Sequence, residues 1–331
     1  MGGKSARPKV SRMVQVIQVL LAIIIVGCLA GCPPPEDLGP CQCHDDPDGA
    51  PALQCRGVTG WEEVATIFTD LGLDYISSVD IIYSPDLTDL PPSAFADVLI
   101  DAIRFYNTGL EYLNKDVFSV ETANGLTSLY IKYNSEFTTL ENNVAGSLPA
   151  LFALYCSHNK LGSLSEALEP TTVPYIDFSN NEITSIAPDY FFGAQNLSQL
   201  LLPFNQLTSE SLMAGSLTFS GEEEDMYLDL AWNHLSEGVN PSAFGGRMAK
   251  ELILSHNNIT TLSSETFSPL LDHMFSDYGL EAYILLDGNA LGCECDMSWV
   301  VSHKAHDILK LAECSDGRLV SGLTEADFAN C

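Results

Sequence analysis

Few residues of this sequence have the types and spacing that chemistry requires. His303 and His306 form an isolated pair, for which two surface histidines are a better explanation than a metal site. His158 and His256 each stand in a Ser-His-Asn run, at matching positions of a repeat described below. The acidic run 222–225 lacks the alternating ligands of a calcium loop, which favours a solvated loop.

Known catalytic and cofactor-binding motifs are missing from the sequence. It contains no nucleophile elbow, phosphate loop, dinucleotide fingerprint or zinc-protease helix motif. We therefore predict a protein that is not an enzyme and that uses no cofactor or metal.

Cysteine is the residue type whose spacing does indicate chemistry. Apart from Cys28 and Cys156, the cysteines form two groups of four, near the two ends of the chain: Cys32, Cys41, Cys43 and Cys55, then Cys293, Cys295, Cys314 and Cys331. Such groups are typical of disulfides in an oxidising compartment. Zinc is the competing interpretation, but the Cys-x-Cys spacings and a secretory signal count against it. Cys156 falls on a buried strand position and is predicted to be an inert free thiol.

Residues 1–31 are predicted to be a secretory signal peptide. A basic stretch precedes the apolar run 13–29, and Cys28 and Ala30 supply small residues at the cleavage positions. An uncleaved membrane anchor is the alternative, although the run is short and contains two glutamines. Residues 29–32 also resemble a bacterial lipoprotein box, which would use Cys32 for lipid attachment.

Secretion has further support in the rest of the chain. Asn196 and Asn258 begin Asn-x-Ser/Thr sequons and are predicted glycosylation sites. No second apolar span follows the first, so we expect the mature chain to be extracellular, without insertion into a membrane.

The chain is strongly acidic, with 14 Lys and Arg against 44 Asp and Glu and a formal net charge of −30. Without residues 1–31, ten basic residues remain against the same 44 acids, a net charge of −34. Such a surface repels nucleic acid and anionic lipid, so we expect neither as a partner. It suits a cationic or neutral partner.

A repeat dominates the middle of the chain. Units with the spacing Leu-x-x-Leu-x-Leu-x-x-Asn-x-Leu, some with a substituted first position, place their asparagines at Asn159, Asn181, Asn205, Asn233, Asn257 and Asn289. Upstream the pattern loosens: one unit near Asn134 carries an extra residue, another has Thr108 at the asparagine position, and a weaker one lies near Val79. About nine units with a period near 25 residues result, which lies within the range of leucine-rich repeats.

The chain therefore resembles the leucine-rich-repeat family. The family fold is an α/β solenoid, here with a curved parallel sheet of about nine short strands. The alternating Leu-x-Leu core fits a strand with one buried face, and the asparagine can bond backbone groups at the turn. Phenylalanines between the strands, such as Phe191, Phe244 and Phe267, would fill the core from the outer side.

Both ends of such a stack expose core and need caps. The segment Cys293-Glu-Cys295 with Trp299 resembles the C-terminal cap of extracellular members of this family, and residues 32–55 resemble the N-terminal cap. The resemblance implies the disulfides Cys32–Cys43, Cys41–Cys55, Cys293–Cys314 and Cys295–Cys331. It divides the chain into a signal (1–31), an N-terminal cap (32–60), repeats (61–291) and a C-terminal cap (292–331).

The run from Cys32 through Pro40 to Cys43 carries a more specific resemblance. It is similar to the N-terminal cap of arthropod leucine-rich-repeat subunits that accompany a small luciferase and perform no chemistry themselves. This implies a secreted, non-catalytic, protein-binding subunit, with a small catalytic subunit as one candidate partner. The alternative is an adhesion or receptor-like protein held at the cell surface by an uncleaved N-terminal segment.

Positions that alternate with the core leucines should face the concave side of the solenoid. From these and from the position before each asparagine, we predict the partner-binding residues Tyr130, Tyr155, Tyr175, Asp177, Phe204, Tyr227, Asp229 and Trp232. Aromatic residues are frequent anchors in protein interfaces. Two interpretations remain open for the position before the asparagine, where side chains either contact a partner or pack against their neighbours at the strand ends.

Overall fold

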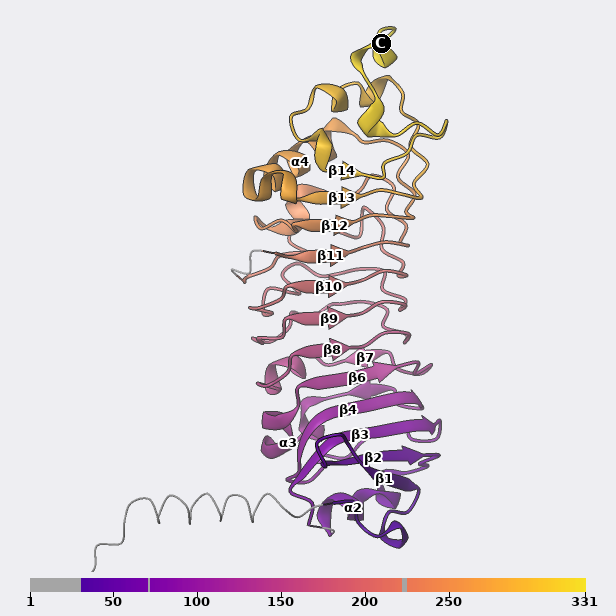
Figure 1. Cartoon of the computed structure of the whole chain (residues 1–331), viewed down its shortest axis with the longest axis vertical. Helices are drawn as coiled ribbons and strands as arrows, with labels where there is room; N and C mark the ends of the chain where they lie inside the picture. Colours follow the sequence, from indigo (N-terminus) through magenta and orange to yellow (C-terminus); the bar gives the residue numbers. More distant parts are fainter. Residues whose placement is uncertain (1–30, 71, 222–224) are drawn as a thin grey trace, which may run out of the picture.

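The computed structural model describes residues 31–70, 72–221 and 225–331, and the predicted signal peptide lies outside these residues except for Gly31. The described chain winds into one elongated solenoid whose strands stack along its length (Figure 1). The strands of the repeats are β3 (Tyr75–Ser84), β4 (Leu99–Thr108), β6 (Ser128–Lys132), β8 (Ala153–Tyr155), β9 (Tyr175–Asp177), β10 (Gln199–Leu201), β11 (Tyr227–Asp229), β12 (Glu251–Ile253) and β13 (Tyr283–Leu285).

These nine strands form one parallel sheet, which confirms the predicted solenoid. The caps extend the sheet to twelve strands. An antiparallel hairpin of β1 (Cys41–Asp45) and β2 (Pro51–Arg56) joins β3, and β14 (Leu309–Lys310) joins β13. Two of the strands, β3 and β4, are longer than the others, with ten residues each.

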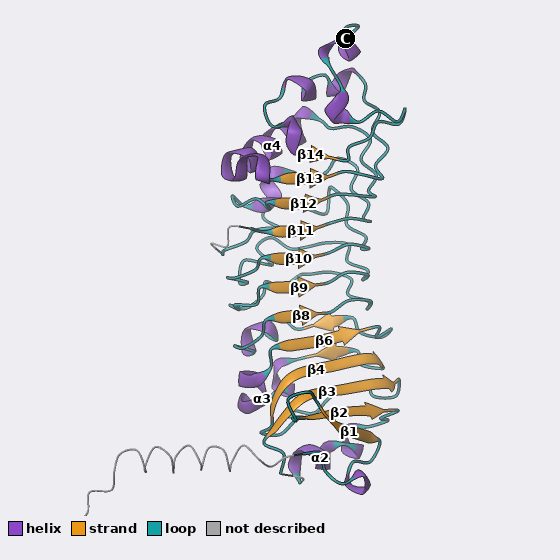
Figure 2. Ribbon diagram, in the orientation of Figure 1, coloured by secondary structure: helices purple, strands orange, loops and turns teal. Residues whose placement is uncertain are grey.

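The other side of the solenoid carries turns and helices (Figure 2). The α-helices are α2 (Ala65–Thr69), α3 (Val120–Gly125) and α4 (Ser264–Tyr278), and β5 (Tyr112–Leu113) pairs with β7 (Thr139–Leu140) in a separate ladder. The 3-10 helices are Pro35–Asp37, Trp61–Glu63, Lys115–Val117, Ala145–Ser147, Pro241–Phe244, Gly279–Glu281, Cys295–Met297, Val300–Ser302, His306–Ile308, Val320–Gly322 and Glu325–Phe328. No helix in the described part of the chain is long and apolar enough to span a membrane.

The core lies between the sheet and these turns. Every second strand residue points into it, as the alternation predicts, and Leu154, Ile176 and Leu200 are completely buried. From the opposite side Phe191, Phe244 and Phe267 are also completely buried, as expected. The core is continuous along the solenoid, so each repeat is stabilised mainly by its neighbours.

Buried asparagines fasten each repeat to the next. Asn205 accepts a hydrogen bond from the backbone N–H of Ile183 and donates to the backbone oxygens of Phe178 and Leu202. Equivalent bonds recur at Asn181, Asn233, Asn257 and Asn289. They satisfy backbone groups at the turn after each strand, where the chain leaves the sheet.

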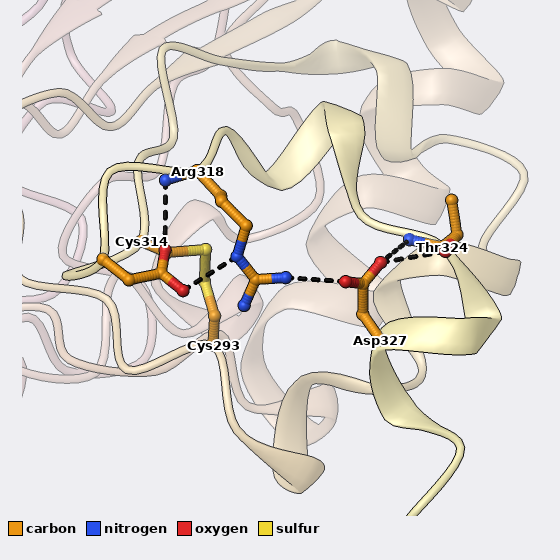
Figure 3. Close-up of a disulfide and its surroundings, with 6 residues drawn as sticks. Cys293, Cys314, Arg318, Thr324 and Asp327 are labelled. Carbon is orange, nitrogen blue, oxygen red and sulfur yellow. Dashed lines mark hydrogen bonds and ion pairs between the residues drawn. A yellow bond between two sulfur atoms is a disulfide. The ribbon is translucent and has the colours of Figure 1, made fainter.

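Disulfides close both ends of the solenoid. All four bonds implied by the family resemblance are present: Cys32–Cys43, Cys41–Cys55, Cys293–Cys314 and Cys295–Cys331. Beside Cys314, Arg318 lies between Asp316 and Asp327, which reinforces the C-terminal cap (Figure 3). Trp299 packs against the core and donates to the backbone oxygen of Leu262, consistent with a structural role.

Candidate protein-binding face

The pairing register decides which of the predicted contact residues lie side by side. Tyr130, Tyr155, Asp177 and Asp229 occupy one column across the sheet, with Leu201 between the two aspartates. Tyr175 and Tyr227 occupy the column two positions earlier in their strands, separated by Gln199. The structure therefore distributes the predicted strand residues over two columns of the concave face.

Three of these residues form a tyrosine stack, which we define as Tyr130, Tyr155 and Tyr175. The Tyr130 and Tyr155 rings are parallel within 5° with centroids 4.4 Å apart, and Tyr175 lies 4.9 Å from Tyr155 at a tilt. Burial raises the pKa of Tyr155, and that of Tyr175 to about 12. The phenols of Tyr155 and Tyr175 therefore stay neutral and can offer hydrogen bonds from their edges.

Two cations lie over the tyrosine stack. The Arg104 guanidinium is 5.1 Å from the centroid of Tyr130, and the Lys132 ammonium is 4.6 Å from that of Tyr155. Arg104 forms a 2.8 Å ion pair with Asp80, and Lys132 a 3.4 Å ion pair with Asp177. The cations and their acids balance, so this part of the face is aromatic and close to neutral.

Asp177, one of the two predicted contact aspartates, is largely buried by its neighbours on the face. Its side chain is only 9% exposed, because Oδ1 accepts from the backbone N–H and the hydroxyl of Ser179 while Oδ2 faces Lys132. It holds Lys132 in place and is not available for direct contact. Asp229 is half-buried and accepts from the N–H of Ala231. Burial raises the pKa of the Asp229 carboxyl.

The residues before the asparagine position form a second feature, the aromatic column. It contains Tyr83, Asn107, Tyr133, His158, Asn180, Phe204, Trp232 and His256, all of which have positive φ between 49° and 60°. Only a few per cent of non-glycine residues adopt this left-handed region, so their alignment is a consequence of the repeat. Gly288 ends the column, since a Cβ there would lie 2.2 Å from Nδ1 of His256.

The two interpretations of this column turn out to be compatible. Tyr133 stacks on His158 with centroids 4.3 Å apart, and Trp232 stacks between Phe204 at 5.2 Å and His256 at 4.0 Å. The same rings remain open to solvent, with Phe204 and Trp232 each 47% exposed. The rings pack against their neighbours and still present their edges on the surface.

Sequence reasoning missed the start of the aromatic column. Tyr83 is 59% exposed, and the Arg56 guanidinium lies 5.3 Å from its centroid. Tyr83 and Asn107 precede Ser84 and Thr108, which take the asparagine position in their repeats. The Ser84 hydroxyl accepts from the N–H of Val58, so it replaces one asparagine bond. Because the spacing already assigns Thr108 to this position, it also locates Asn107, and allowing Ser there would have located Tyr83 as well.

The predicted histidine and sequon positions are also resolved. His158 and His256 share a column, as their matching runs predict, and burial together with nearby Lys132 lowers the pKa of His158. Asn196 and Asn258 are exposed, and their glycosylation stays a prediction. Across residues 31–70, 72–221 and 225–331, no three His, Cys, Asp or Glu side chains gather as a metal ion would require.

Comparison with known protein sequences finds a leucine-rich repeat in this chain and relatives that resemble it. The Leucine Rich Repeat family model matches residues 249–270. The non-catalytic subunit of Oplophorus-luciferin 2-monooxygenase from Oplophorus gracilirostris is 24% identical over 90% of this chain and 87% of that protein. Fibromodulin from Bos taurus is 27% identical over 52% of this chain, and the match spans less than half of fibromodulin, 43%.

Solved structures show the same architecture. Human 5T4 (Wnt-activated inhibitory factor 1) superposes with a TM-score of 0.57 at 17% identity, over 90% of this chain and 99% of that one. A chain of the octameric complex of Latrophilin 3, Unc5D and FLRT2 gives a TM-score of 0.57 at 15% identity, covering 85% and 91%. At these identities the likeness concerns the fold. The chain therefore has the fold of a leucine-rich-repeat solenoid with a disulfide-bonded cap at each end, and one of its repeats matches the family model.

Proposed function

We propose that this protein is a secreted, non-catalytic binding subunit that holds a protein partner on its concave face. The observation that carries the proposal is the aromatic column, whose rings are stacked into fixed positions and yet about half exposed. Rigid aromatic side chains lose little conformational entropy when a partner covers them, which makes them effective anchors. The tyrosine stack lies on the same face and enlarges the contact surface.

The charge distribution supports a partner that is neutral or cationic. The predicted mature chain has a formal net charge of −34, so approach of a cationic protein is favoured over long range. On the face itself Asp80 and Asp177 neutralise Arg104 and Lys132. Long-range attraction from the acidic surface and short-range contact with neutral aromatic rings are therefore separate contributions to binding.

Secretion is supported by chemistry at the ends of the chain. The four disulfides require an oxidising compartment to form and persist. N-terminal sequencing of the purified protein tests this part of the proposal. A start near Gly31 is the expected result, whereas a retained apolar run 13–29 would indicate a cell-surface protein anchored by that segment.

A small catalytic subunit is the partner that we propose to test first, because the Oplophorus relative is itself named a non-catalytic subunit. The isolated chain should neither oxidise Oplophorus luciferin nor emit light, since the residues on the face provide binding groups without a reactive constellation. Sustained turnover by the pure chain would overturn the non-catalytic assignment.

Matched variants test the binding face. The natural partner is captured from the source with the tagged chain and identified by mass spectrometry, and its affinity is then measured for Trp232→Ala and Tyr155→Ala. Loss of an exposed aromatic anchor should weaken binding by about 30-fold, equivalent to roughly 2 kcal/mol. Phe192→Ala is the control, because Phe192 is 55% exposed and lies in a turn outside the sheet.

Melting temperatures decide how these results are interpreted. If the two face variants melt like the unsubstituted chain and bind weakly, the aromatic face is the binding site. If they melt well below it while affinity per folded molecule is unchanged, the rings are structural. If neither quantity changes, the partner binds elsewhere and the proposed site is wrong.

A further inference from the structure

The aromatic column is interrupted at two places. In chain order the column consists of Tyr83, Asn107, the stacked pair Tyr133 and His158, Asn180, and the stacked trio Phe204, Trp232 and His256. Register places Asn107 on the strand between those of Tyr83 and Tyr133, and backbone bonds from His158 to Ser179 and from Asn180 to Pro203 place Asn180 between His158 and Phe204. We call each position of the aromatic column a rung. Each asparagine rung therefore lies between two rungs that carry an aromatic ring.

The width of each interruption matches one additional ring. Neighbouring strands are about 4.8 Å apart, so the rungs that flank an asparagine are separated by about 9.6 Å. The stacked rings already present have centroid separations of 4.0–5.2 Å. A planar group placed midway between His158 and Phe204, or between Tyr83 and Tyr133, would have the stacking distance that the rest of the column uses.

The base of each interruption is polar and unpaired. Asparagine is shorter than the aromatic side chains beside it, so it fills less of the space between the flanking rings. Neither the Asn107 nor the Asn180 amide hydrogen-bonds to another side chain or backbone group in the described part of the chain, and Asn107 is exposed while Asn180 is half-exposed. Each amide can both donate and accept, which suits a ring with a polar edge.

We propose that the rungs at Asn107 and Asn180 each receive an aromatic side chain of the protein partner, tryptophan or tyrosine, stacked between this chain's own rings with its polar edge on the asparagine amide. The inference rests on the proposed function, because it specifies how a partner engages the concave face. It adds two defined sites and the chemistry of the group that fills each of them.

The two sites also define the spacing of the partner's rings. Asn107 lies on β4 and Asn180 just after β9, three strand steps apart with β6 and β8 between, which is about 14 Å along the solenoid. An extended peptide advances about 3.4 Å per residue, and residues four apart lie on the same side of it. The sites therefore fit an extended partner segment whose aromatic residues are four positions apart.

Synthetic peptides test the spacing on the full secreted chain. The probe is a fluorescein-labelled ten-residue peptide of serine and glycine, with one lysine and two tryptophans four positions apart. The comparison peptides have tryptophans three positions apart, or alanines in their place, and carry the same charge. Fluorescence anisotropy should show the four-apart peptide binding at least about 10-fold more tightly than either, as two doubly stacked rings permit. Equal binding of the three peptides would overturn the inference.

Variants that place a ring at Asn107 or Asn180, or that remove the side chain of Asn180, test whether these two positions are the binding sites. Asn107→Phe and Asn180→Phe supply the missing ring from this chain, and the left-handed backbone tolerates it because Phe204 and Trp232 have φ of 56° and 54°. Each should reduce affinity for the four-apart peptide about 10-fold. Asn180→Gly leaves the rung open and should bind within about 3-fold of the unsubstituted chain. Asn124→Phe, on an exposed position of α3, is the control for an added ring elsewhere.

The outcomes separate this inference from the proposed function. If the two phenylalanine variants bind the peptide and the natural partner like the unsubstituted chain, or if Asn180→Gly loses as much as Asn180→Phe, the rungs are not the sites. Should Trp232→Ala still lose the natural partner in that case, the binding face stands and only the inference about the rungs falls. If Trp232→Ala and Tyr155→Ala both retain the natural partner, the proposed function itself fails.

Discussion

At the scale of single residues, the two aspartates of the concave face have different roles. Asp177 is covered by its neighbours on the face and is held by Ser179, with Lys132 as its counter-ion. Asp229 remains half-exposed and has no ion pair in the described structure. Two aspartates in the same column therefore have different roles: Asp177 positions Lys132, whereas Asp229 stays partly accessible to a partner.

Replacing Asp177 with alanine should destabilise the fold. The substitution leaves the N–H of Ser179 without its acceptor and Lys132, whose side chain is 20% exposed, without its counter-ion. The expected loss is about 1–3 kcal/mol of unfolding free energy, measured by urea denaturation. Asp177→Asn keeps an acceptor for Ser179 and should lose less. Unchanged unfolding of Asp177→Ala would contradict the positioning role.

Replacing Asp229 with asparagine should stabilise the chain at neutral pH. Burial raises the folded-state pKa of this carboxyl above its ordinary value of 3.8. Ionisation is therefore disfavoured in the fold, and stability falls as the pH rises from 3.8 through the raised pKa. Asparagine does not titrate and can still accept from Ala231. Its melting temperature should be roughly 1–3 °C higher at pH 7 and equal below pH 3.8.

At the scale of the repeat, buried asparagines determine the turn after each strand. Asn205→Ala should leave the N–H of Ile183 and the backbone oxygens of Phe178 and Leu202 without their side-chain partner. The expected cost is about 1–3 kcal/mol of unfolding free energy. Asn124→Ala, at an exposed position of α3 outside any sequon, is the control and should unfold like the original chain. Equal stability of the two variants would show that the asparagine contributes little.

The same repeat explains how much could be predicted from sequence. Because burial alternates along a strand, spacing alone located the strands, the core and the columns of the face. The burial of Asp177 on the face could not be predicted, since it depends on a lysine two strands away, Lys132, and on the local bond to Ser179. Tyr83 was missed because its repeat has Ser84 in place of the diagnostic asparagine, whereas Thr108 does mark the position of Asn107 in the sequence.

At the scale of the whole molecule, the caps protect a core that is continuous from end to end. Reductant should lower the melting temperature markedly, because each loop-closing disulfide contributes about 3 kcal/mol. The paired change Cys295→Ser with Cys331→Ser opens a bond with a sequence separation of 36 and should reproduce part of that loss without reductant. Buried Cys156 serves as the control, since Cys156→Ala should leave the response to reductant intact. Identical melting of oxidised and reduced protein would refute the structural role of the caps.

The alignment of the aromatic column has a consequence for how such a protein diversifies. The backbone at these positions is fixed by the neighbouring asparagine bonds, and tyrosine, histidine, phenylalanine, tryptophan and asparagine all occupy the same left-handed conformation there. The identity of the side chain is thus uncoupled from folding at this surface position in the repeats from Tyr83 to His256, whereas the last repeat requires Gly288. Natural selection can change these positions one at a time and acquire new specificity, while the scaffold that displays them is inherited unaltered.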